Sequence, residues 1–180
     1  MKKEDLFFLL DVENFTQEMA KEYFLRKNKT TIPSSAVSTP CAIAYIAQDG
    51  KLEVLPYLDL NRAVYVWGIK VDNLIFEKDE DAPCTYSKAQ KIHRLDSVKN
   101  VEKLLPYSAD YEKLSNHIED FQETISILRQ YGVSAAYLSK GDYWIADERG
   151  ESVFIRCPKG KFVDHRESMS AHVRWVVRLN

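Results

Sequence analysis

The last forty residues, Gly141–Asn180, constrain the fold more than any other stretch of the chain. They contain three segments of strand-like composition, which are 142–145, 152–155 and 172–179. Turn signals rich in glycine, proline and charge separate them, at 148–150 and 158–160. A chain that closes on an amphipathic strand generally adds that strand to a sheet formed by earlier residues. The C-terminal region therefore predicts a sheet that draws on the whole chain.

The closing segment alternates with a period of two, as a half-buried antiparallel strand requires. One face carries Val173, Trp175, Val177 and Leu179, and the other carries His172, Arg174, Val176 and Arg178. We expect Trp175 to be buried. We expect Arg174 and Arg178 to lie on the wetter face.

The first forty residues predict a helix followed by a connecting loop. Phe15, Met19 and Tyr23 recur at helical spacing within residues 4–27, and polar residues cover the other side. Residues 28–40 are rich in Asn, Thr, Ser and Pro, which is typical of a loop. One helix has no core of its own, so we assign residues 1–40 to the same globule as residues 41–180.

Two hairpins and a helical middle follow. The first hairpin joins residues 41–47 to 51–57 through an Asp-Gly turn, and the second joins 62–71 to 74–78. Residues 63–69 are almost continuously apolar, which predicts a central strand covered on both faces. Helices are expected over 86–95 with Thr85 as cap, from Ser108 as cap, and over a segment that contains Ile118, Phe121, Ile125 and Leu128 and stops at Gly132. The fold class is α+β, with helices on a mostly antiparallel sheet and an added N-terminal helix.

Net charge and the lengths of the apolar runs limit the partners and the cellular location that we expect for this protein. The 180 residues carry a formal net charge of −2, and no basic stripe is interleaved with aromatics, so no nucleic-acid partner is expected. The apolar run 6–10 is shorter than the about 7–15 residues of a signal peptide's core, and no run reaches the about 20 residues of a membrane span. We expect a cytoplasmic protein without a membrane span, or a cell-surface protein if a leader precedes this sequence.

The order of several short motifs resembles a family of C-type-lectin-like domains that includes the phage major tropism determinant and paralogous proteins of gut bacteria. The motifs are Ala63–Gly68, Ile75–Glu77, Thr85–Ala89, Leu105-Pro106, Asp110–Leu114, Tyr143-Trp144, Glu148, Lys159–Lys161, Val173–Val176 and Leu179. Lys103 and Leu104 stand where the family commonly has tryptophan and arginine, and Ile145–Asp147 replaces a serine-rich run. The resemblance covers roughly residues 60–180 and implies a lectin-like α+β fold. We assign this domain to residues 41–180, and whether residues 1–60 belong to its core is not determined by the sequence. The resemblance does not imply lectin activity, because the calcium- and sugar-binding Glu-Pro-Asn motif is missing from the sequence.

Catalytic and metal-binding patterns are weak. Cys157 with Asp164 and His165 could form a thiol nucleophile with its base and orienter, but the hairpin between them favours a structural role. Cys41, Cys84 and Cys157 are spread apart and are expected to be buried, and the four histidines lack metal-ligand spacing. The acidic run 77–81 lacks the glycine and final glutamate of a calcium loop and is interpreted as a solvated turn. No cofactor or metal is expected.

The candidate ligand-binding surface lies on the loops between the Tyr143-Trp144 strand and the last strand. Its polar residues are Asp147, Glu148, Arg149, Arg156, Asp164, His165, Arg166 and Glu167. The main hypothesis is a non-enzymatic recognition module for a protein or glycan, since binding residues are often carried by loops on a rigid scaffold. The alternatives are an enzyme using Cys157 and His165, or a structural protein that pairs through its N-terminal helix. The oligomeric state is left open.

Overall fold

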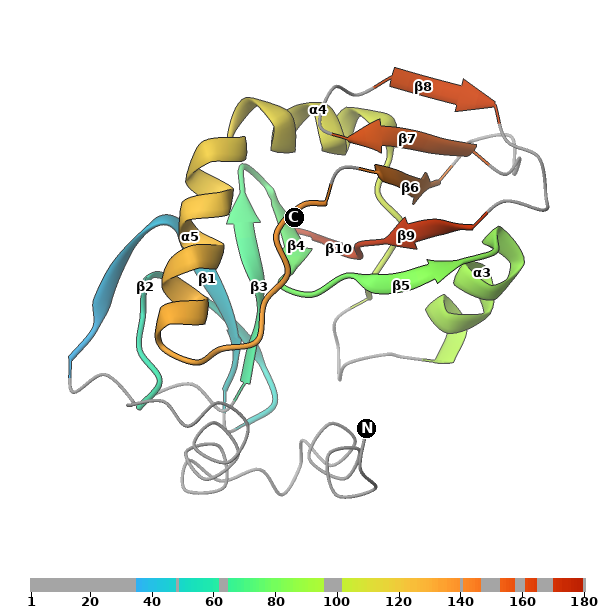
Figure 1. The fold of residues 1–180 in the computed structure, drawn as a ribbon. Coiled ribbons are helices and arrows are strands. Elements are labelled where there is room, and N and C mark those ends of the chain that lie inside the picture. Colours follow the sequence, from blue (N-terminus) through green and yellow to red (C-terminus); the bar gives the residue numbers. More distant parts are fainter. Residues whose placement is uncertain are drawn as a thin grey trace.

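A computed structural model of the chain describes residues 35–47, 49–61, 65–95, 102–139, 141–146, 153–157, 161–164 and 170–179. These residues form an α+β fold of ten strands and three helices (Figure 1). The elements are β1 (Val37–Ile46), β2 (Leu52–Leu58), β3 (Tyr65–Val71), β4 (Leu74–Glu77), β5 (Asp81–Cys84), α3 (Tyr86–Leu95), α4 (Ser108–Asn116), α5 (Ile118–Gln130), β6 (Gly141–Ile145), β7 (Val153–Cys157), β8 (Lys161–Asp164), β9 (Ala171–Val173) and β10 (Val176–Arg178). The predicted helix over 4–27 lies outside the described residues.

The first sheet has the strand order β10-β4-β3-β1-β2, with every neighbouring pair antiparallel. It confirms both predicted hairpins and places β3 in the centre, where Val66, Trp67 and Ile69 are buried. The hairpin turns contain Gly50 and Asp72 with φ of 78° and 52°, in the left-handed region that Gly, Asn and Asp tolerate best. β1 starts at Val37, inside the stretch predicted to be loop.

The second sheet has the order β5-β9-β6-β7-β8 and holds most of the C-terminal region. The prediction of a single strand over 172–179 is wrong, because this segment forms two strands that belong to different sheets. β9 pairs with β5 and β6, whereas β10 pairs with β4. Between them, the Trp175 carbonyl accepts a 2.9 Å hydrogen bond from the Glu77 N–H. The C-terminal segment therefore ties the two sheets together.

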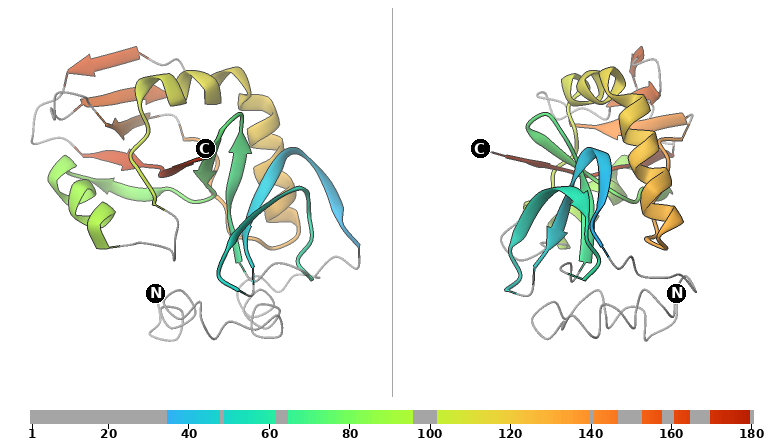
Figure 2. Two further views of the ribbon diagram at one scale, coloured as in Figure 1. Left: turned by 180° about the vertical axis from the view of Figure 1, so that it is seen from behind. Right: turned by 90° about the vertical axis from the view of Figure 1, so that its left-hand side faces the viewer.

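The helices largely follow the prediction. α3 matches its expected bounds, and α5 ends before Gly132, which has a φ of 83°. The cap of α4 is Tyr107 rather than the predicted Ser108. α5 packs along one side of the first sheet (Figure 2) and buries Phe121, Ile125 and Leu128 there.

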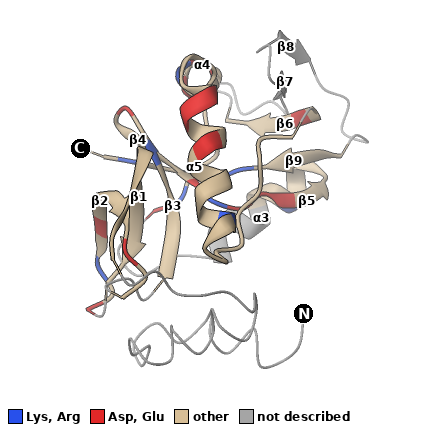
Figure 3. Cartoon of the chain, turned by 60° about the vertical axis from the view of Figure 1, so that its left-hand side comes forward, with Lys and Arg blue, Asp and Glu red and all other residues tan. Residues whose placement is uncertain are grey.

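Lysine, arginine, aspartate and glutamate residues are interspersed along the described elements (Figure 3). In that part of the chain, no helix is long and apolar enough to cross a membrane. Trp175 is fully buried, as predicted, and its indole N–H donates a 2.9 Å hydrogen bond to Asp81 Oδ2.

Candidate functional site

Only two residues of the predicted loop surface, Arg156 and Asp164, lie in the described part of the chain. Asp147, Glu148, Arg149, His165, Arg166 and Glu167 lie outside the described residues. For Arg156 in β7 and Asp164 in β8 the structure gives the backbone position alone. Cys157 ends β7, and its proposed partner His165 is likewise outside the described residues.

The strand register nevertheless fixes where these loops begin. Ile145 pairs with Val153, and Val153 pairs with Asp164, so the ends that border 147–152 and 165–169 are neighbours in the sheet. Arg156 pairs with Asp142 and Lys161, near the opposite end of β7. Asp164 thus lies at the loop-bearing end of the sheet, and Arg156 lies away from it.

A described, exposed tyrosine stands at the same end. The N–H of Ala146, directly after β6, donates a 2.8 Å hydrogen bond to the Pro106 carbonyl. The next residue, Tyr107, is 44% exposed. The Arg178 guanidinium lies 4.6 Å from the centre of the Tyr107 ring, a cation–π distance. The start of α4 and the end of β10 therefore meet beside the loops.

A buried carboxylate holds this pair in place. Asp110 Oδ2 accepts a 2.7 Å hydrogen bond from the Tyr107 N–H, and the carboxylate accepts two from Arg178, at 3.0 and 2.5 Å. The Asp110 side chain is 4% exposed, against 31% for Arg178. The Asp110 hydrogen bonds raise the pKa of Arg178 above its usual value. We call Tyr107, Asp110 and Arg178 the Tyr107 surface.

Sequence reasoning missed Tyr107 and described Arg178 only as a wet-face residue. Its expected outward orientation is consistent with the half-buried position observed. The signal that could have revealed the pair is Asp110 at the third position of α4, where a carboxylate satisfies the free N–H of the cap residue. Nothing in the sequence pairs that carboxylate with an arginine 68 residues later.

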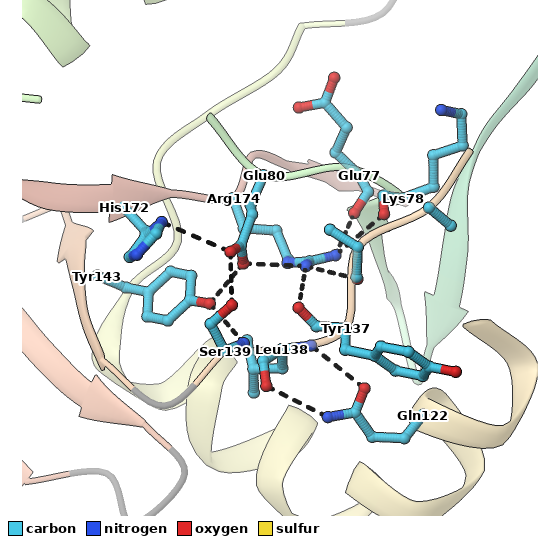
Figure 4. A network of polar contacts seen from close by, with 12 residues as sticks. Glu77, Lys78, Glu80, Gln122, Tyr137, Leu138, Ser139, Tyr143, His172 and Arg174 are labelled. Atoms are coloured by element: carbon cyan, nitrogen blue, oxygen red, sulfur yellow. Dashed lines mark hydrogen bonds and ion pairs between the residues drawn. The ribbon is translucent and has the colours of Figure 1, made fainter. Parts of the chain in front are cut away.

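A second polar network lies between the two sheets and centres on Arg174 (Figure 4). Arg174 is 0% exposed, contrary to the predicted wet face. Its Nη1 donates to the Glu77 carbonyl at 2.9 Å, and its Nη2 donates to the Ala136 carbonyl at 2.8 Å and to Glu80 Oε2 at 3.2 Å. The side chain is buried because β9 and β10 diverge at Arg174, and carbonyls of the surrounding loops replace water as its acceptors.

Glu80 is the anionic centre of this network and corrects the interpretation of 77–81 as a solvated turn. Its side chain is 11% exposed and accepts hydrogen bonds from the Tyr143 hydroxyl and from Ser139 Oγ, the latter at 2.7 Å. Burial raises the pKa of Glu80, but the hydrogen bonds from Tyr143 and Ser139 and the charge of Arg174 outweigh it, so the net pKa is lowered. His172 Nδ1 lies 3.5 Å from Glu80 Oε1. We call Arg174, Glu80, Tyr143, Ser139 and His172 the Arg174 cluster.

The chemistry of the Arg174 cluster is that of a structural network. The Glu80 carboxylate and the Arg174 guanidinium bind each other, and the guanidinium also donates to backbone carbonyls. Burial raises the pKa of the Tyr143 hydroxyl, so this hydroxyl is a weaker acid than that of a free tyrosine. A buried network of this kind fixes one arrangement of the loops that it joins. It orients residues 77–80 and 136–139 against the C-terminal segment.

Two of the three cysteines, Cys41 and Cys84, have described side chains. Cys41 and Cys84 are buried, as predicted, and burial raises the pKa of both thiols. Among the residues with described positions, no group of three or more His, Cys, Asp or Glu side chains could hold a metal ion. The positions of the Cys157 and His165 side chains lie outside this description.

No protein-family model, curated protein or solved structure matches the chain.

Proposed function

We propose that this chain is a non-enzymatic recognition module of C-type-lectin-like fold that binds a protein or a glycan. The binding surface comprises the Tyr107 surface and the neighbouring loops that carry Asp147, Glu148, Arg149 and Asp164–Glu167. The observation that carries the proposal is the exposed Tyr107 ring, held on a rigid frame where the loop-bearing strand ends meet.

The chemistry of this surface suits recognition. Tyrosine and arginine are enriched among the residues that dominate binding energy at protein interfaces, because they combine a large contact area with directed hydrogen bonding. Asp110 fixes the Tyr107 backbone and the Arg178 guanidinium, and that guanidinium lies against the Tyr107 ring, so less side-chain entropy remains to be lost on binding. A tyrosine ring also offers an apolar face to a sugar ring. Both proposed ligand classes fit.

Two features support the lectin-like assignment. The family motifs occur in order along residues 60–180, and β10, at the end of the closing motif, lies in the same sheet as β3, which holds Tyr65–Gly68 of the first motif. The main departure, Lys103 in place of tryptophan, puts an ammonium group 5.2 Å from the centre of the Trp175 ring. The position thus keeps a contact with the core of the domain.

The test is a screen of the full chain against a glycan array and a displayed-peptide library, with two variants run in parallel. Tyr107→Ala removes the proposed anchor. Tyr137→Ala is a matched control, because Tyr137 is 41% exposed and has the Arg129 guanidinium 5.1 Å from its ring centre. Loss of a hot-spot tyrosine costs about 2 kcal/mol or more, or about thirtyfold in affinity.

We expect hits that lose at least tenfold in affinity with Tyr107→Ala and less than twofold with Tyr137→Ala. Hits that respond equally to both variants, or only to Tyr137→Ala, would place recognition elsewhere on the chain. An absence of hits in both libraries would contradict the proposed ligand classes.

A further inference from the structure

The first sheet buries apolar side chains on both faces. α5 covers one face; the other, which we call the outer face, forms a separate cluster that extends across all five strands. Its buried members are Ala44, Ile46, Trp67, Ile75 and Val177, and Leu52, Val54, Tyr65 and Leu179 pack against them. Every one of these residues lies in a strand of the sheet or directly after one.

The outer face is buried too well for an open sheet. Trp67 is 2% exposed, Ile75 and Ile46 are 0% exposed, and Val177 is 7% exposed. Side chains that stand side by side on one face shield each other's flanks but not the surface that points away from the sheet. An apolar sheet face has to pack against another layer. Trp67 and Ile75 therefore require a further layer over them.

We propose that residues 1–34 of the same chain form this layer, through the helix that the sequence predicts over 4–27. This segment precedes β1, one of the strands whose side chains form the outer face. At about 4.8 Å between strands, five strands extend about 19 Å, which a helix of about 13 residues spans. Each of the other segments outside the described residues has six residues or fewer.

The composition of the predicted helix fits this face. Phe15, Met19 and Tyr23 share one side and give it the large apolar groups that an aromatic and aliphatic sheet face accepts. Glu18, Lys21 and the other charged residues share the opposite side, which would remain in water. The partner of the outer face is thus an intramolecular helix, and this inference is independent of the proposed binding function.

Hydroxyl-radical footprinting with mass spectrometry of the full chain tests this directly, because it reads the solvent exposure of individual side chains. Trp67 reports on the outer face. Trp144, which is fully buried in the second sheet, reports on whether the fold is intact. The wild-type monomer should protect Trp67, Met19 and Tyr23. Met19→Glu should raise the oxidation rate of Trp67 at least fivefold and leave Trp144 unchanged, whereas the control Lys21→Glu should change neither.

Three outcomes would overturn the proposal. Trp67 could stay protected in a folded Met19→Glu monomer, or Met19 could be fully oxidised while wild-type Trp67 is protected. Trp67 could also become exposed when dilution converts a wild-type dimer to monomers, which would make a second copy the cover. If Met19→Glu exposes Trp144 as well, the milder Phe15→Ala variant decides. A selective rise at Trp67 supports the proposal, and no rise contradicts it.

Discussion

Replacing Arg174 by methionine tests the structural role of the Arg174 cluster most sharply. Methionine keeps an unbranched apolar stem of similar length and removes the guanidinium. Glu80, with a side chain 11% exposed, then loses its cation, and the carbonyls of Glu77 and Ala136 lose their donor. Removing one partner of a buried ion pair costs about 3–5 kcal/mol, because the remaining charge is left buried without compensation. We expect Arg174→Met to lower the free energy of unfolding by that amount.

The assay is urea unfolding at pH 7 followed by circular dichroism, on a double-mutant cycle. Glu80→Gln alone removes the anion, and the double variant removes both charges, so the double variant should lose less than the sum of the two single variants. Lys51→Met is the control, because both side chains of its ion pair with Asp49 are exposed, at 76% and 53%, so it should lower the free energy of unfolding far less than Arg174→Met. A loss below 1 kcal/mol for Arg174→Met, or strict additivity in the cycle, would refute the buried-pair interpretation.

Three further predictions follow from burial. Glu77 has a pKa of about 7 against 4.5 in a free side chain, because it is buried. The stability that protonated Glu77 contributes is fully present below pH 4.5 and is lost as the pH rises through 7. The free energy of unfolding of Glu77→Gln, measured by urea titration, should therefore rise relative to wild type by up to about 3 kcal/mol between pH 5 and 8. An unchanged difference between the two proteins across that range would contradict this. Trp175→Ala should cost about 3–5 kcal/mol in unfolding free energy, and an unaltered melting temperature would show that the indole is not a core group. Cys41 and Cys84 should resist iodoacetamide in the native protein at pH 7.5, and fast labelling of either would be inconsistent with a buried thiol of raised pKa.

Local patterns in the sequence predicted most of the elements. The Asp-Gly turn, the continuous apolar run around Trp67 and the helical spacing up to Gly132 depend on neighbours in sequence, and the structure confirms all three. Trp175 could be predicted as buried because a large aromatic in an alternating strand faces the core.

The errors concern contacts between distant segments. Alternation placed Arg174 in water, but the chain passes from one sheet to the other at this residue and meets carbonyls from residues 77 and 136. The acidic run 77–81 looked solvated for the same reason, since its cation lies 94 residues later. The Tyr107 surface depends on an ion pair between α4 and β10, and no local pattern encodes that pair.

The proposed function requires ligands to bind at the Tyr107 end of the second sheet. The most direct measurement is an amide NMR titration of the isotope-labelled full chain with a ligand selected in the screen. We predict shifts that cluster at Tyr107, Ala146 and Arg178, with Tyr137 and His172 unmoved. Shifts confined to His172 and the rest of the Arg174 cluster, or to Tyr137, would contradict the account.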